Sequence, residues 1–383
     1  MIVLVSNIGS TSFKFRLFDM TDERELARGG AERIGEENAS VKVGDQTWSG
    51  RLGNHGEAID RCLAMLPDPD LKIDAIGFKA VHGGPISGAV RVDGHVIQTM
   101  EEFFDIAPAH NPPYVAAMRA FAEKRSNTPQ VAAFETAFHQ TIPPSRTTYG
   151  VPWEWTEAGV RRYGFHGASH RYISVRTAEL LKRDDLKIIS CHLGGSSSIC
   201  AINAGKSVAN SFGTTPQSGL PHNNRVGDFD TYALLKALPK FDLTLDEAMT
   251  AMAKNGGLLG ISGVSNDIRD LTAAANDGND RAKLAIDVLV ESIRHYIGAY
   301  LAVLNGADVI VFTGGIGENQ VPIRAAVCAN MDYAGIKLDP EKNNLRGEET
   351  TISAADSKVR IMTIPTNEEL IVARQTRDVI ENS

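Results

Sequence analysis

The chain alternates short apolar runs, rich in β-branched residues, with longer stretches of helical periodicity. Four of the apolar runs end in glycine or polar residues, as buried strands do: residues 2–7, 130–136, 187–193 and 307–315. Apolar positions three or four apart predict an amphipathic core helix over residues 281–304. Its stripe consists of Leu289, Ile293, Ile297, Leu301 and Leu304. Alternating strands and helices predict parallel or mixed sheets covered by helices, with ligands at the carboxyl ends of the strands.

Two Gly-Ser turns that follow apolar runs lie about half a chain apart, "SNIGSTSFKF" at 6–15 and "CHLGGSSSIC" at 191–200. This separation favours a duplicated domain over a short solenoid repeat. A chain of 383 residues also exceeds what one hydrophobic core usually sustains. The Pro-rich segment at 140–152 marks a boundary, and residues 368–380 predict a helix. We predict an N-terminal domain of residues 1–148, to which a C-terminal helix at 366–383 returns, and a second domain of residues 149–365.

Composition narrows the partners to small or neutral molecules. The formal net charge is −8 and Lys and Arg form no long run, so nucleic acid and anionic membranes find no basic surface. No apolar stretch approaches the roughly 20 residues of a membrane span, and no signal-peptide pattern opens the chain. The cysteines lack CxxC or metal-ligand spacing, which predicts buried free thiols and a cytoplasmic protein. They are Cys62, Cys191, Cys200 and Cys328.

Glycine-rich turns after strands can cradle phosphate, because glycine lets backbone N–H groups approach an anion closely. One such turn indicates little, since "GSTS" is not a Walker sequence and most Gly-Ser turns are plain loops. A third turn, "FTGGIGEN" at 312–319, follows the apolar run "ADVIVF" and supplies Gly314, Gly315 and Gly317. Three such turns in one chain favour nucleotide binding, with the two duplicated turns gripping a polyphosphate from both sides.

Longer motifs make the chain resemble the acetate kinases of the acetate and sugar kinase, Hsc70 and actin superfamily. They follow the family's order along nearly the whole chain: "NIGSTSFKF", "VHGG" with "APAHNPP", "TAFHQT", "RRYGFHGASHRY", "CHLGGSSS", "LLGISGVSNDIRDL", "VFTGGIGEN" and "IPTNEEL". The resemblance implies an α/β fold of two ribonuclease H-like domains, which arise from duplication of a βββαβαβα core, and an ATP cleft between them. It also implies a homodimer, with small carboxylates and ATP or ADP as partners.

The implied reaction, formation of an acyl phosphate, requires neutralisation of negative charge more than it requires a general base. A carboxylic acid with a pKa of about 4 is already ionised at neutral pH. The obstacle is repulsion between two anions, so catalysis depends on cations, Mg²⁺ and alignment.

The resemblance assigns catalytic roles to three residues. Arg225 matches an arginine that bridges the substrate carboxylate and the phosphoryl group, although a salt bridge with Asp228 or Asp230 is the alternative. His166 in "YGFHGASH" matches a histidine whose Nε2–H donates to the phosphoryl group, although a lone histidine is more often a core residue. Glu135 stands where the family has an aspartate with an acid/base or metal-positioning role.

Asn7 and Glu368 match the family's positions for Mg²⁺ or Mn²⁺, ions that prefer hard oxygen ligands. Without the resemblance, Glu368 would be read as a solvated surface carboxylate. Lys14 matches an ATP-contacting lysine, and otherwise would be a charge at a strand edge. The other implied nucleotide contacts are His192, Leu193, Gly194, Gly195, Ser196, Asp267, Ile268, Arg269, Gly315, Ile316, Gly317, Glu318 and Asn319.

The acyl end of the implied site departs most from the family. The resemblance places Lys79, Val81, Ala109, Phe165 and Pro216 there. Lys79 replaces an arginine and loses its bidentate fork, Glu135 is one methylene longer than aspartate, and Ala109 replaces a leucine that lines the acetate methyl pocket. For His82 and His110, which also lie near the family's cleft, a functional and a structural role are equally expected.

Other departures lie in two loops. Gly195 and Ser196 replace Asn-Gly, "PHNNR" at 221–225 replaces "MMGTR", and Pro85 replaces a glutamate. Three interpretations remain open: an acetate kinase that tolerates these changes, a kinase for propionate, butyrate or a hydroxy acid whose pocket is remade by Ala109, His222 and Asn223, and a nucleotide-binding sensor with little turnover. The retained "GGIGEN" favours a nucleoside triphosphate as the donor.

Overall fold

The computed structural model describes residues 1–68, 71–104 and 111–382. The chain forms two compact units: unit 1, Met1–Phe138 with Asn367–Ser383, and unit 2, His139–Thr366. Unit 2 begins ahead of the boundary predicted at 148, because residues after Phe138 bond to it. Thr141 Oγ1 donates to the carbonyl of Ser207 (2.7 Å), and Arg146 to that of Val208 (3.1 Å).

Unit 1 contains a mixed sheet with the strand order β5-β4-β3-β2-β1-β6-β8-β7. Strands β1 to β5 form an antiparallel meander, β6 is parallel to β1, β8 is parallel to β6, and β7 is antiparallel to β8. The strands are β1 (Ile2–Gly9), β2 (Ser12–Asp19), β3 (Arg24–Glu32), β4 (Ala39–Val43), β5 (Gln46–Gly50), β6 (Ala75–Ala80), β7 (Ala89–Arg91) and β8 (Gln130–Phe134).

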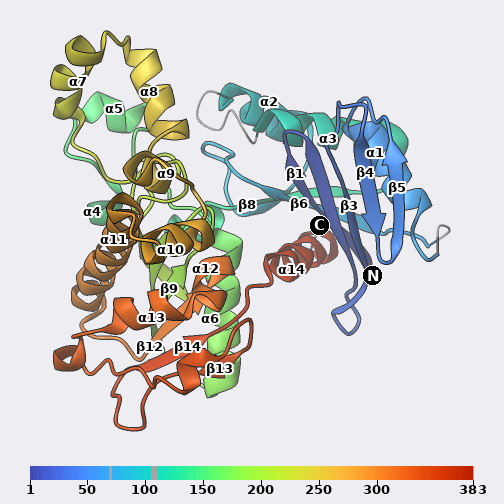
Figure 1. The fold of residues 1–383 in the computed structure, drawn as a ribbon. Helices are drawn as coiled ribbons and strands as arrows, with labels where there is room; N and C mark the ends of the chain where they lie inside the picture. Colours follow the sequence, from blue (N-terminus) through green and yellow to red (C-terminus); the bar gives the residue numbers. More distant parts are fainter. Residues whose placement is uncertain (69–70, 105–110, 383) are drawn as a thin grey trace. The chain divides into compact units, whose positions relative to one another are not determined.

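Helices cover both faces of this sheet (Figure 1). They are α1 (His55–Ala64), α2 (Gly94–Glu102), α3 (Asn111–Lys124) and α14 (Glu368–Glu381), the last being the predicted C-terminal helix. Successive side chains of a strand point to opposite faces. Leu4 and Ile8 therefore pack with α1 and α3, whereas Val3 and Val5 pack with α14. Because both faces are buried, β1 reads as an almost continuous apolar run.

Unit 2 contains a second mixed sheet, with the strand order β11-β10-β9-β12-β14-β13. Strands β9, β10 and β11 are antiparallel neighbours, β12 is parallel to β9, β14 is parallel to β12, and β13 is antiparallel to β14. The strands are β9 (Lys187–His192), β10 (Ser198–Asn203), β11 (Lys206–Asn210), β12 (Val309–Thr313), β13 (Thr350–Thr351) and β14 (Arg360–Thr363).

The predicted core helix at 281–304 is confirmed as α11 (Asp280–Leu304), capped by Asn279, whose side chain accepts from the N–H of Ala282 (3.0 Å). The other α-helices are α4 (Pro144–Thr147), α5 (Trp153–Glu157), α6 (Gly167–Leu181), α7 (Leu234–Phe241), α8 (Leu245–Lys254), α9 (Gly257–Ser262), α10 (Ile268–Asn276), α12 (Gly314–Asn319) and α13 (Val321–Cys328). Short 3-10 helices are η1 (Ala137–Thr141), η2 (Thr231–Ala233), η3 (Asp332–Ala334) and η4 (Lys342–Asn344).

The two sheets share one topology, which confirms the predicted duplication. The order β3-β2-β1-β6-β8 in unit 1 matches β11-β10-β9-β12-β14 in unit 2, with the same parallel and antiparallel pairings. The two Gly-Ser turns therefore occupy equivalent places, the β1–β2 and the β9–β10 hairpins. The ATP cleft that the resemblance implies stays a prediction.

The structure also bears on the predictions about the cysteines and about membrane-spanning segments. All four cysteines are buried and unpaired, as predicted. Among the described helices, none is both long enough and apolar enough to cross a membrane.

Candidate nucleotide and phosphoryl-transfer sites

Three of the predicted nucleotide-binding segments meet in unit 2 around a cavity of about 460 Å³. One is the β9–β10 turn, the second is the start of α10, and the third is the glycine turn after β12. Residues far apart in the sequence thus share one concave surface, as a ligand pocket requires. The lining consists of Gly194, Gly195, Asn223, Asn266, Asp267, Ile268, Arg269, Gly315, Ile316, Asn319 and Gln320.

The two glycine turns are joined through Leu193. Its carbonyl accepts from the N–H groups of Ile316 (2.8 Å) and Gly317 (3.1 Å), and its own N–H donates to Thr313 (2.8 Å). Gly314 has φ 76°, and a methyl group there would lie 2.7 Å from the Leu193 carbonyl oxygen, so only glycine fits. These bonds hold the backbone of both turns at the cavity.

Two of the predicted residues in the third turn hold the turn itself. Glu318 Oε1 accepts from the N–H of Gly314 (2.8 Å) and of Thr366 (3.3 Å). Asn319 Nδ2 donates to the carbonyl of Gly315 (3.0 Å). Both side chains therefore stabilise the conformation that presents Gly315.

Asp267 and Arg269 lie at the start of α10 and line the same cavity. Asp267 is the N-cap, accepts from the N–H of Arg269 (2.8 Å) and pairs with its guanidinium (2.5 Å). Hydrogen bonds from the Arg269 side chain and backbone lower the pKa of Asp267 to about 2. The capping pair thus holds the Arg269 guanidinium, which is 77% exposed, at the rim of the cavity.

Arg225 reaches the β9–β10 turn, where it donates to Ser196 Oγ (3.2 Å). The alternative salt bridges do not form within the described part of the chain. Asp228 instead accepts from the N–H of Gly219 (2.9 Å) and from Tyr296 (2.5 Å), and Asp230 accepts from the N–H of Tyr232 (3.0 Å). Burial lowers the pKa of Arg225, but a guanidinium stays charged at neutral pH.

His166 is the N-cap of α6 and has a left-handed backbone, with φ 55° and ψ 33°. A non-glycine residue held in this region is a strained feature that clusters at functional sites. Its Nδ1 lies 2.8 Å from Ser198 Oγ, and its ring centroid lies 4.2 Å from that of His192.

Phe212 gathers the predicted acyl-side residues of unit 2. Its ring centroid lies 5.2 Å from that of His166, 5.9 Å from Phe165 and 5.7 Å from His222. His222 Nε2 lies 3.3 Å from the carbonyl oxygen of Pro216. Phe212 was not predicted from the sequence, where its only signal is an aromatic residue two positions after the end of β11.

Unit 1 holds a buried cluster of charge made by three predicted residues. Lys79 of β6 contacts Glu368, the first residue of α14, and its Nζ lies 3.8 Å from Glu135 Oε1, directly after β8. Burial alone would lower the pKa of Lys79, but the charges of Glu368 and Glu135 outweigh burial and raise it. The two departures Lys79 and Glu135 thus touch each other, and Glu368 is not the surface carboxylate that its sequence neighbours suggest.

Tyr114 positions the other predicted metal residue. Its hydroxyl accepts from the N–H of Ile8 (3.1 Å) and donates to Asn7 Oδ1 (3.2 Å). Burial raises the pKa of Tyr114 to about 12, so the hydroxyl keeps the proton that it donates. No sequence pattern marked this tyrosine.

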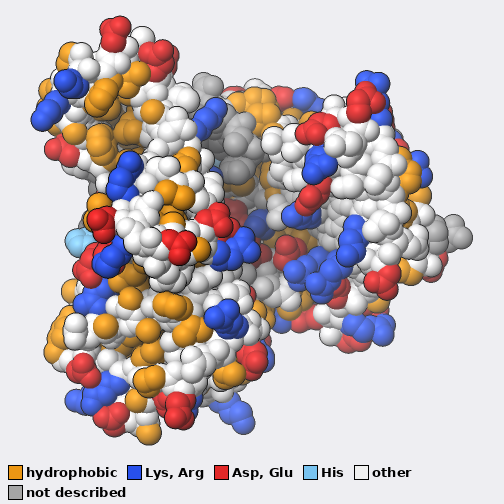
Figure 2. Space-filling model, in the orientation of Figure 1, with side chains coloured by type: hydrophobic (Ala, Val, Ile, Leu, Met, Phe, Trp, Pro, Cys, Tyr) orange, Lys and Arg blue, Asp and Glu red, His pale blue; other side chains and the backbone are white. Residues whose placement is uncertain are grey.

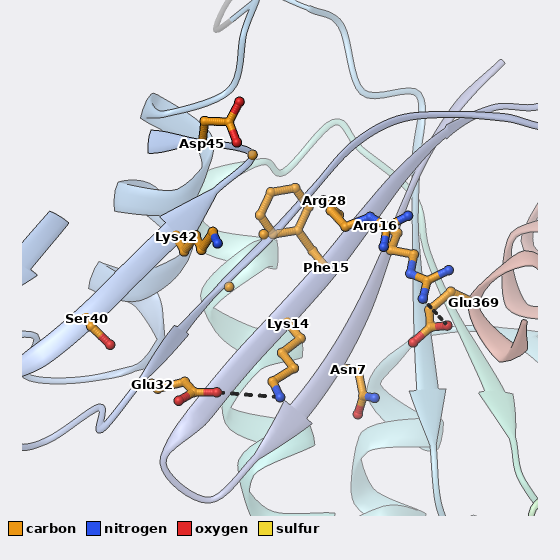
Figure 3. Close-up of a pocket in the computed structure, with 13 residues that line it drawn as sticks. Asn7, Lys14, Phe15, Arg16, Arg28, Glu32, Ser40, Lys42, Asp45 and Glu369 are labelled. Atoms are coloured by element: carbon orange, nitrogen blue, oxygen red, sulfur yellow. Dashed lines mark ion pairs between the residues drawn. The ribbon is translucent and has the colours of Figure 1, made fainter. Parts of the chain in front are cut away.

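Asn7 and Lys14 line a second cavity in unit 1, of about 810 Å³ (Figure 3). They are cross-strand partners on β1 and β2. Lys14 Nζ lies 3.5 Å from Glu32, and both side chains are exposed. Arg16 lies farther along the same strand, where it donates to the N-cap of α14, Asn367 Oδ1 (3.2 Å).

The other predicted residues of unit 1 are less informative. Val81 is half-buried against the core of unit 1. His82 is buried, accepts from the N–H of Gly84 (2.9 Å) and stacks on Phe103. Burial lowers the pKa of His82 to about 4. Ala109 and His110 lie outside the described residues.

Residues 2–374 match the model of the Acetokinase family. An acetate kinase of Clostridium novyi (strain NT) is 42% identical over 398 residues, covering 100% of this chain and 99% of the relative. The crystal structure of Porphyromonas gingivalis acetate kinase has a TM-score of 0.92 at 38% identity, and that of a propionate kinase from Francisella tularensis subsp. tularensis SCHU S4 has 0.92 at 34%, each covering 99% of both chains.

The shared topology and these matches define a two-domain α/β kinase with the actin, Hsc70 and sugar kinase fold. More narrowly, the chain belongs to the Acetokinase family.

Proposed function

We propose that the protein is a kinase that transfers the γ-phosphoryl group of ATP directly and reversibly to the carboxylate of acetate, giving acetyl phosphate and ADP. The observation that carries this proposal is the cavity of unit 2, where the β9–β10 turn, the start of α10 and the turn after β12 meet. Backbone N–H groups of glycine turns suit phosphate, and Arg269 at the rim suits a nucleobase.

The reaction needs positive charge and donors around the phosphoryl group. Arg225, which reaches the phosphate turn through Ser196, can bind a carboxylate oxygen and a phosphoryl oxygen with its planar fork. His166 would donate to an equatorial phosphoryl oxygen in the transition state. Since the acid is already ionised, no base is required, and Glu135 would set the charge and position of Lys79 instead.

Asn7 and Glu368 are the residues that would hold Mg²⁺ or Mn²⁺, together with phosphate oxygens and water. Their donors are hard oxygens, and Glu368 already has a positive charge as a neighbour, the ammonium of Lys79. Within the described residues, no group of three His, Cys, Asp or Glu side chains is arranged as a metal site. The bound ion would supply charge neutralisation of the triphosphate.

Another short carboxylate, such as propionate, butyrate or a hydroxy acid, is the second candidate substrate. The solved propionate kinase matches this chain with the same TM-score as the solved acetate kinase. One methylene in an apolar pocket changes discrimination by only about 1–3 kcal/mol, so overlapping use of acids is expected.

Hydroxamate trapping with Mg-ATP and a panel of acetate, propionate, butyrate and hydroxy acids tests both candidates. We expect acyl hydroxamate from acetate, with loss of product in Arg225→Ala. Product from a longer acid but none from acetate would replace acetate by that acid. Nucleotide binding by calorimetry with no product from any acid would support the nucleotide sensor and refute the kinase proposal.

We also propose a cytoplasmic homodimer, as the resemblance implies. Large apolar side chains are exposed on and beside α7 and α8 (Figure 2), and a second copy would bury them. They are Tyr232, Leu235, Phe241, Leu245 and Met249. Light scattering gives the mass directly, and Leu235→Lys with Leu245→Lys should yield a monomer.

A further inference from the structure

A chain of buried hydrogen bonds in unit 2 leads to His166. Ser190 Oγ lies 2.9 Å from His170 Nδ1, His170 Nε2 lies 2.9 Å from Ser198 Oγ, and Ser198 Oγ lies 2.8 Å from His166 Nδ1. Ser190, His170 and Ser198 are fully buried. These four residues form what we call the serine–histidine chain.

The fold builds this chain from one helix and two strands. His166 and His170 lie four residues apart at the start of α6, and therefore on one helix face. Helix α6 packs against β9, which carries Ser190. Ser198 faces the same way, because it is the cross-strand partner of His192, two residues after Ser190.

The number of protons on these side chains determines the direction of donation along the serine–histidine chain. A serine hydroxyl has one proton, so Ser198 can donate to only one of the two rings beside it. Burial keeps the pKa of His170 well below its usual value, and the neutral ring therefore has a single N–H.

Suppose first that Ser198 donates to His170. His170 would then carry its proton on Nδ1 and donate to Ser190. Within the described residues, the Ser190 hydroxyl contacts only that nitrogen, so its own buried proton would lack an acceptor. An unsatisfied buried donor is unfavourable, which argues against this direction.

In the opposite direction every proton has an acceptor. Ser190 donates to His170 Nδ1, His170 Nε2–H donates to Ser198, and Ser198 donates to His166 Nδ1. The proton of a neutral His166 must then be on Nε2. We propose that Ser198 and His170 are positioning residues that hold His166 as the neutral Nε2–H tautomer.

This inference rests on the proposed function for its purpose. The oxygens of a transferring phosphoryl group only accept hydrogen bonds, so the ring that faces them must present an N–H. The serine–histidine chain lets His166 do so without a protonated imidazole. The tautomer of His166 can be measured in the absence of ATP and of the acid substrate.

Two-bond ¹H–¹⁵N spectra of histidine-labelled protein read the tautomer directly. The chain has ten histidines, and the signals lost in His166→Gln identify His166. At neutral pH we expect an unprotonated Nδ1 and a protonated Nε2. A His166 with its proton on Nδ1, or protonated on both nitrogens, would overturn the proposal.

Three serine variants separate positioning from a general packing effect. Ser198→Ala and Ser190→Ala should shift both His166 nitrogens toward one averaged value, although Ser190 does not touch His166. Ser207→Ala is the matched control, because Ser207 is equally buried and lies 2.8 Å from His139 Nδ1. It should leave the His166 signals in place.

Kinetics give a second readout for variants that keep the melting temperature of the parent. Ser198→Ala should lower kcat with KM unchanged, by about 10- to 100-fold if the effect is like that of removing the hydrogen-bond partner of a metal-bound histidine. His166 signals in Ser198→Ala that match the parent would refute the positioning role even if activity fell. If the His166 signals change as expected but no acid gives acyl phosphate, the proposed tautomer stands and the proposed kinase activity is refuted.

Discussion

Lys79→Met is the sharpest test of the buried charge cluster in unit 1. It keeps most of the side-chain volume and removes the ammonium that Glu135 and Glu368 share. The three side chains are 20%, 6% and 11% exposed, so water cannot replace the lost partner fully. Breaking a buried ion pair by removing one partner costs about 3–5 kcal/mol, and we expect a loss of unfolding free energy toward that range.

Lys72→Met is the matched control. Lys72 also belongs to unit 1 and lies 3.3 Å from Asp74, but its side chain is 88% exposed. An exposed pair of this kind contributes about 0–1 kcal/mol. The two variants remove the same group, so the difference between them reports burial.

The assay should follow unit 1 alone, because the two units need not unfold together. Trp48 belongs to unit 1, and the other two tryptophans, Trp153 and Trp155, are exposed in unit 2. Urea unfolding in a Trp153→Phe, Trp155→Phe background therefore reports unit 1 through Trp48 fluorescence. Equal losses for Lys79→Met and Lys72→Met would refute the proposed charge compensation.

The loss of unfolding free energy in Lys79→Met should depend on pH in one direction. The folded-state pKa of Lys79 is raised, so its stabilisation is fully present below the unfolded pKa of about 10.4. It is lost as the pH rises through the folded pKa. The gap between the parent and Lys79→Met should therefore stay constant through neutral pH and shrink above about pH 10.4; a gap that widens there would contradict the assigned shift.

Three further changes probe contacts at the candidate sites. Lys79→Arg and Glu135→Asp should each lower kcat, and the double variant should recover it. Because the two groups lie 3.8 Å apart, we expect a coupling free energy of about 0.5–3 kcal/mol. Additive losses of kcat in steady-state kinetics would contradict this coupling. Gly195→Asn should raise the KM for ATP, because its Cβ would lie 3.0 Å from Asn223 Nδ2, and adding Asn223→Gly should restore it; no relief from the second change would sink the idea. Tyr114→Phe should weaken Mn²⁺ binding, measured by electron paramagnetic resonance, about 10-fold or more, whereas unchanged affinity would show that its bond to Asn7 does not matter.

Local patterns in the sequence were sufficient for the elements and their duplication. The predicted strand at 2–7 and the predicted helix at 281–304 appear as β1 and α11. The predicted strand at 130–136 ends at Phe134, because its last ladder partner is Ala80, at the end of β6. The two Gly-Ser turns could be recognised as equivalent because a turn between antiparallel strands is a local feature.

Contacts between distant residues could not be predicted in the same way. Lys79 and Glu368 are 289 positions apart and meet only because α14 returns to the sheet of unit 1. Tyr114 and Asn7, 107 positions apart, meet because α3 packs against β1. Hydrophobic periodicity specifies which face a residue occupies, but it does not specify which residue lies opposite on another element.

The residues that depart from the family pattern contact each other in pairs, so their effects have to be considered together. Taken one at a time, a lysine for arginine and a glutamate for aspartate each weaken a site, but Lys79 and Glu135 touch, so a shorter cation meets a longer anion. By the resemblance, asparagine is expected where this chain has Gly195, and glycine where it has Asn223. A Cβ at position 195 would lie 3.0 Å from the side-chain amide nitrogen of Asn223. The backbone of Asn223 has φ 34°, a positive value that glycine adopts freely. Both pairs conserve the chemistry of the pair while exchanging its parts, which favours a working kinase over a decayed one.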